Sequence, residues 1–174
     1  MSQRRIKPWM VAVALALVGI VGATLVYATG ANLHRSDRRA IVAWYSAGRS
    51  SLEQIDLLIK DVARVGPRVF DATIPEARAA REITRLRSGI EGAKFSLEHL
   101  RVETVMDVIA GAYLNASVEA LAAVTALHQW TFARGGDARA RERDTFETKI
   151  ASAARHWKRA DSAFADLRSR FAIR

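Results

Sequence analysis

The sequence contains no cysteine and only three prolines among its 174 residues. Without cysteine the chain has no disulfide, no thiolate metal site and no site for a lipoprotein anchor. The prolines leave long stretches uninterrupted, and strand-type alternation of Val, Thr and Ile is nearly missing. Alanine, leucine, arginine and glutamate, which are good helix formers, dominate instead. The sequence therefore predicts an all-α protein.

Motifs that carry chemistry are also missing. None of the four histidines has an acidic residue three positions before it, and there is no His-Glu-x-x-His and no glycine-rich phosphate loop after a strand. We therefore expect a protein that is not an enzyme, with no catalytic, cofactor-binding or metal-binding residue and no cofactor. Asn115 and Glu119 stand one helical turn apart on an apolar stretch, and we expect them to form a buried polar pair. The polar groups of such a pair either form their hydrogen bonds within the bundle or make a site for a small ligand or a proton.

One long apolar run, residues 9–29, follows a short basic head. A helix of about 20 residues crosses the hydrocarbon layer of a membrane, so this run predicts a transmembrane anchor. Trp9 and Tyr27 stand near its ends, where aromatic rings favour the headgroup zone. A face for packing on other spans is formed by Gly19, Gly22 and Ala23. A cleaved signal peptide is the alternative, although its apolar core would be shorter.

Basic residues flank the run on both sides and decide its orientation. Arg4, Arg5 and Lys7 favour a cytoplasmic head, whereas Arg35, Arg38 and Arg39 beyond the other end favour the reverse. We expect a cytoplasmic head (1–8), an anchor (9–29) and a helical extracytoplasmic domain (30–174). Abundant arginine and alanine are typical of a GC-rich bacterial genome, so the bacterial inner membrane is the expected location. The net charge of +9 suits anionic lipids or an acidic partner, and in this location we expect no nucleic acid.

Apolar residues spaced alternately by four and three define two seams in the body. This 3.5-residue repeat predicts long helices with coiled-coil-like packing. The first seam contains Ile41, Tyr45, Gly48, Leu52, Ile55, Ile59 and Val62, and the second contains Phe146, Ile150, Ala153, Trp157, Ala160, Phe164, Leu167 and Phe171. Together with the anchor, they indicate one transmembrane helix followed by a three- or four-helix bundle.

Glycine and proline predict where the helices break. Gly66-Pro67 should end the first helix, residues 71–75 should form a loop, and Gly135-Gly136 should precede the last helix. Ser88-Gly89 and Gly92 are weaker breaks. We expect helices over 34–65, 76–88, 93–133 and 138–171, with 88–92 either turning the chain or lying inside one long helix.

Residues 108–127 are rich in small apolar side chains and have two interpretations. They could form a second membrane span, but Glu119 near the middle would cost about 2.5–3.5 kcal/mol on insertion. The buried central helix of the bundle is the favoured interpretation.

This layout resembles the extracytoplasmic four-helix sensor domains of bacterial chemoreceptors, in topology alone. Those receptors continue into a second span and a cytoplasmic output module, whereas this sequence ends at Arg174. The expected function is therefore that of a non-catalytic accessory or scaffold subunit of a membrane complex, with membrane lipids and other membrane protein subunits as partners. The alternative is a helical module that binds a lipid or small molecule and works with a separate membrane partner.

Overall fold

The computed structural model describes the backbone of residues 8–173 and the side chains of residues 35–173. Over this part of the chain every regular element is helical and no strand occurs, which confirms the prediction of an all-α protein. The elements, in chain order, are α1 (Pro8–Phe70), α2 (Glu76–Glu98), the short 3₁₀ helix η1 (Thr104–Met106), α3 (Asp107–Phe132) and α4 (Gly136–Arg170).

The chain divides into two compact units, Met1–Arg39 and Ala40–Arg174. In the first unit the described backbone is helical from Pro8 onward. The basic head, apart from Pro8, lies outside the described residues, and so do the side chains of the anchor. The placement of Trp9, Tyr27 and of the face formed by Gly19, Gly22 and Ala23 therefore stays a prediction.

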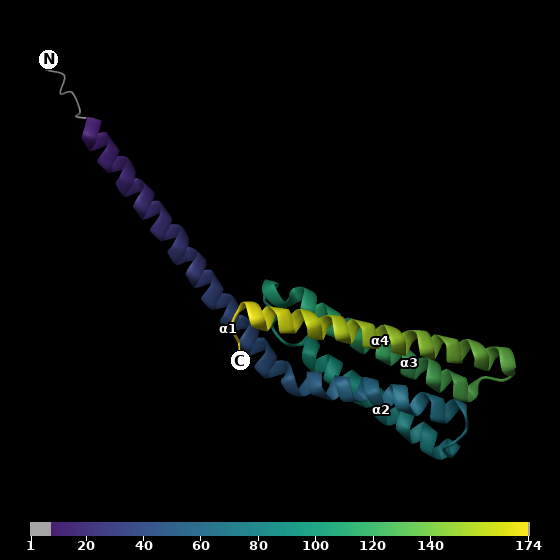
Figure 1. The fold of residues 1–174 in the computed structure, drawn as a ribbon. Helices are drawn as coiled ribbons and strands as arrows, with labels where there is room; N and C mark the ends of the chain where they lie inside the picture. The colour runs from purple at the N-terminus through teal and green to yellow at the C-terminus, as the bar shows by residue number, and fades with distance from the viewer. Residues whose placement is uncertain (1–7, 174) are drawn as a thin grey trace. The chain divides into compact units, whose positions relative to one another are not determined.

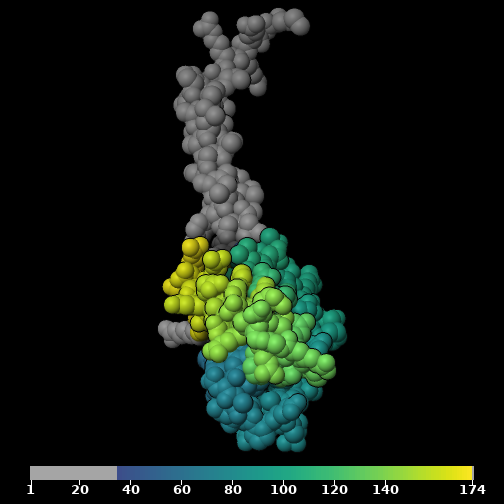
Figure 2. All heavy atoms as spheres, turned by 90° about the vertical axis from the view of Figure 1, so that its right-hand side faces the viewer, coloured from purple at the N-terminus to yellow at the C-terminus, as the bar shows by residue number. Residues whose placement is uncertain are grey.

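The second unit contains α2, α3, α4 and the C-terminal half of α1, which run alongside one another (Figure 1). Figure 2 views this unit from the end that carries the α1–α2 and α3–α4 turns, and shows the green segments at the α3–α4 turn packed on the blue-teal segments of α1 and α2. Apolar side chains from all four helices form one continuous core.

The seams predicted for the first and last segments face this core. Six of the seven first-seam residues are buried, with Tyr45 partly buried. In α4 four seam residues are buried and the other four are partly buried. The buried stripe of α1 is wider than the seam, because Trp44, Leu58 and Val65 are buried beside it. A stripe of this width is typical of a globular bundle.

The predicted end of the first helix at Gly66-Pro67 is wrong, because α1 continues to Phe70. Proline disfavours a helical conformation of the preceding residue partly by a clash with that residue's Cβ, and Gly66 has none. The bare backbone of Gly66 serves the packing instead: a Cβ there would lie 2.2 Å from Cζ of Phe146 on α4.

A break or turn at residues 88–92 is also wrong, because α2 runs without interruption to Glu98. Gly89 lets Leu58 of α1 approach closely, since a Cβ there would lie 3.1 Å from the Leu58 methyl groups. The predicted single helix over 93–133 is wrong as well, because the chain turns over residues 99–103, before η1 and α3. The predicted loop over 71–75 is confirmed, and so is the glycine turn before α4, where Gly135 has φ +90°.

The apolar segment around residues 108–127 forms α3, the core helix of the second unit. Its inward residues Ala116, Ala120, Val124 and Leu127 are completely buried. Among the described residues, η1 with α3 is the one helical stretch (Thr104–Phe132) whose length and apolar composition would suffice to cross a membrane. Burial of these residues against neighbouring helices agrees with the favoured interpretation of a central bundle helix.

Candidate functional site

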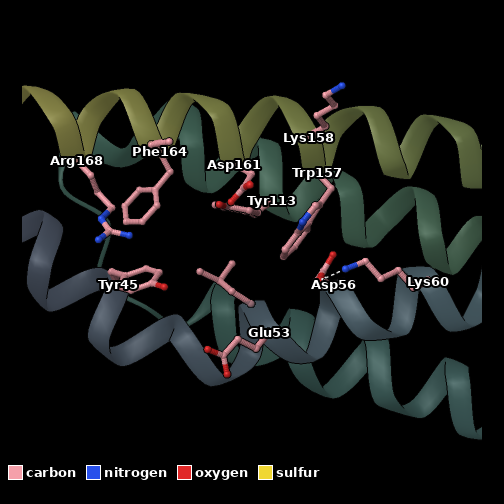
Figure 3. A pocket seen from close by; sticks show the side chains of 12 residues that line it. Tyr45, Glu53, Asp56, Lys60, Tyr113, Trp157, Lys158, Asp161, Phe164 and Arg168 are labelled. Carbon is pink, nitrogen blue, oxygen red and sulfur yellow. Dashed lines mark hydrogen bonds and ion pairs between the residues drawn. The ribbon is translucent and has the colours of Figure 1, made fainter. Parts of the chain in front are cut away.

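A groove of about 470 Å³ opens between α1 and α4 (Figure 3). Its size lies in the range typical of sites for small molecules. Tyr45 and Leu52 line it from α1, Trp157 and Phe164 line it from α4, and Tyr113 of α3 forms its back. These residues meet because α1 and α4 pack along one another and place residues distant in sequence at one level.

Aromatic rings form the apolar lining of the groove. The rings of Tyr45 and Phe164 stack with centroids 4.8 Å apart, and Trp157 meets Tyr113 edge-on, also at 4.8 Å. Behind them the ring of Trp44 stacks on Tyr113 at 6.3 Å. These contacts fix the ring orientations, because aromatic pairs favour such offset and edge-on geometries.

Charged groups surround the aromatic lining. Asp56 is paired with Lys60, with 2.6 Å between carboxylate oxygen and Nζ. The guanidinium of Arg168 lies 5.9 Å from the centroid of the Tyr45 ring. Asp161 makes no ion pair within residues 35–173, and Figure 3 shows its side chain directed into the groove beside Tyr113, whereas Lys158 points away. The groove therefore contains one carboxylate without a cationic partner among the described side chains.

Tyr113 is the most enclosed polar residue of the groove, with 2% of its surface exposed. Burial raises the pKa of its hydroxyl, and the neighbouring Asp161 carboxylate and Tyr45 raise this pKa further. Within residues 35–173 the hydroxyl makes no hydrogen bond. It therefore remains a neutral donor and acceptor on the groove wall.

The buried polar pair expected at Asn115 and Glu119 is wrong in part. Asn115 is exposed, and Glu119 is partly buried and bonded to Lys149 of α4, with 3.1 Å between Oε2 and Nζ. Since α3 is apolar nearly all around, its sequence does not indicate which face points inward. Glu119 thus joins α3 to α4 at the edge of the core.

The outward face of α3 carries no Asp, Glu, Lys or Arg after Asp107. Its residues are again spaced alternately by three and four, and they include the exposed Val108, at 83%, and Phe132, at 72%. The face consists of Val108, Gly111, Asn115, Val118, Ala122, Thr125, Gln129 and Phe132, here called the outer α3 face. The exposed surfaces of α1 after residue 40, α2 and α4 are by contrast rich in charge, with ion pairs along each helix.

Sequence reasoning missed both the groove and the outer α3 face. The signal for the groove was present, because Tyr45, Trp157 and Phe164 all stand on the two seams. Whether these three side chains lie next to one another depends on how far α4 is shifted along α1. The sequence pattern of a single helix does not indicate that shift. Over residues 35–173 no three His, Asp or Glu side chains gather closely enough to hold a metal ion.

Comparisons with known proteins add no homologue. The chain matches no protein-family profile, no curated protein and no solved structure.

Proposed function

We propose that the protein is a single-pass protein of the bacterial inner membrane that acts by association, as a non-catalytic accessory or scaffold subunit of a membrane complex. The head stays in the cytoplasm, residues 9–29 span the bilayer, and the helical domain lies on the outer side. The basic residues Arg4, Arg5 and Lys7 support this orientation, because positive charge near a span favours the cytoplasmic side.

The observation that carries the proposal is the outer α3 face. A helix face exposed to water normally carries charge, as the faces of the other helices do here. The outer α3 face is instead uncharged: it presents apolar and small residues together with the polar Asn115, Thr125 and Gln129. Its 3.5-residue spacing matches the repeat by which one helix packs along another. On this face the exposed Val108, Val118 and Phe132 are the apolar residues that would contact a partner helix.

The partner is a helix of another subunit with an uncharged, apolar face. A charged partner surface would find no counter-charge on the outer α3 face and would lose its hydration. The anchor supplies a second contact through Gly19, Gly22 and Ala23, because small residues allow close approach of spans. Once one of the two contacts has formed, it holds the second pair of surfaces close together. The second contact then forms at a high effective concentration, so two weak contacts together bind the partner more tightly than either alone.

The test places a charge on the outer α3 face. Val118→Lys introduces an ammonium at a position that is 47% exposed, so the domain itself remains folded. The full chain, extracted from membranes in mild detergent, should migrate on native gels in a complex larger than itself, and Val118→Lys should release it. Leu57→Lys, on α1 and 63% exposed, is the matched control and should leave the complex intact.

Three outcomes contradict the proposal. The first is a parent chain that is monomeric in mild detergent, and the second is a complex that Val118→Lys leaves unchanged. The third is a complex with the mass of two copies, which would make the outer α3 face a self-association surface.

A further inference from the structure

Beyond association with a partner, we propose that the groove between α1 and α4 binds a small organic ammonium ion with an apolar body. The ammonium group lies beside Asp161 and the Tyr113 hydroxyl, and the apolar body lies against the rings of Trp157 and Phe164. The site uses a different surface from the outer α3 face.

The aromatic lining selects for a cation. The face of an aromatic ring attracts positive charge, and several rings around one cavity form the cage that recognises organic ammonium ions. Four aromatic side chains line this groove. Arg168 already uses the face of Tyr45 in this way at one end of the groove, which leaves the part around Asp161 for a ligand.

The polar groups select for the same charge. Asp161 has no cationic partner within residues 35–173, whereas Asp56 in the same groove is neutralised by Lys60. The Tyr113 side chain is almost completely buried, its hydroxyl makes no hydrogen bond in this part of the chain, and it lines the cavity. The hydroxyl oxygen reaches the cavity, since among the described residues the buried side-chain polar atom without a partner is Nε1 of Trp44 and not this oxygen. A ligand in the cavity can therefore form a hydrogen bond to it. An ammonium group can donate one hydrogen bond to the Asp161 carboxylate and another to the Tyr113 hydroxyl oxygen.

The apolar body of the ligand follows from the walls. Leu52, Trp157 and Phe164 present carbon surface on both sides of the groove, and the volume of about 470 Å³ leaves room for a ring or a short alkyl chain. A fully hydrated inorganic cation would gain nothing from these walls. The structure therefore favours an amine with a hydrophobic substituent.

The test uses two probes of the same shape and opposite charge. The purified full chain in a nonionic detergent is titrated calorimetrically with 2-phenylethylammonium and with 3-phenylpropionate, and each titration is repeated with detergent alone. We expect the ammonium to bind and the carboxylate to give only the detergent signal. Asp161→Asn should weaken binding of the ammonium at least about tenfold, because a hydrogen bond to a charged group is lost. Tyr113→Phe, which keeps the ring, should weaken it several-fold.

Asp166→Asn is the matched control, since Asp166 is an exposed carboxylate on the same helix that does not line the groove. It should bind the ammonium as the parent does. The proposal is overturned if neither probe binds at millimolar concentration, if both bind equally, or if Asp161→Asn binds as tightly as the parent. These results leave the association proposal untouched, because Val118 and the outer α3 face are unchanged in every variant.

Discussion

The ring of Phe146 on α4 lies directly against the backbone of Gly66 on α1. A Cβ added to Gly66 would lie 2.2 Å from Cζ and 2.5 Å from Cε1 of this ring. Phe146 is also buried and meets Phe70 edge-on, with 5.2 Å between centroids, so it has little freedom to move away. Gly66 therefore serves to bring α1 and α4 together.

Replacing Gly66 by Ala should destabilise the protein. Alanine in a helix is normally favoured over glycine by about 1 kcal/mol, but overpacking against a buried ring costs about 1–3 kcal/mol. We expect a lower free energy of unfolding in urea. Gly92→Ala is the matched control, because a Cβ at Gly92 meets no atom within 4 Å and should stabilise α2. If the two variants gained equal stability, the close approach of Phe146 would be refuted.

Replacing Trp157 by Ala should cost about 3 kcal/mol. Removal of a core aromatic side chain costs about 3–5 kcal/mol, and the lower end applies because Trp157 is only partly buried beside Tyr113. Urea unfolding monitored by circular dichroism measures the loss. Phe132→Ala, at the 72% exposed Phe132, should stay within about 0.5 kcal/mol of the parent. A Trp157→Ala variant as stable as the parent would place this ring outside the packed interior.

The stability of the protein should fall at alkaline pH through Tyr113. Burial raises the pKa of Tyr113 above the ordinary value of about 10. From about pH 10 upward the unfolded chain releases this proton while the folded chain keeps it, so the folded state binds more protons and the free energy of unfolding falls as pH rises. Urea unfolding at pH 8 and pH 10.5 should show a larger loss for the parent than for Tyr113→Phe. Equal losses would contradict the raised pKa.

The run at residues 9–29 should keep the full chain in the membrane fraction during alkaline carbonate extraction. A chain beginning at Ser36 lacks this run and should appear in the soluble fraction, which makes it the control. A soluble form of the natural chain that starts near Ala31 would show instead that the run is a cleaved signal peptide.

The sequence predicted the inward faces of α1 and α4 because these helices carry charge on one side and apolar residues on the other. For α3 the same reasoning failed, since its residues are apolar nearly all around and Asn115 gives no sign of its exposure. Glycines were the second source of error. Gly89 packs against Leu58, a residue 31 positions earlier, and nothing near Gly89 in the sequence distinguishes a packing glycine from a turn.

The Glu119–Lys149 ion pair has a consequence for how the chain is made. Lys149 follows Glu119 by 30 positions, so during synthesis α3 emerges with its carboxylate still unpaired. In the proposed topology α3 then passes the machinery that sorts apolar helices into the bilayer, and Glu119 stands near the centre of the stretch Thr104–Phe132. An ionised side chain at that depth costs about 2.5–3.5 kcal/mol on insertion. In that topology Glu119 would disfavour insertion of α3 into the bilayer, and its carboxylate would pair with Lys149 once α4 has followed.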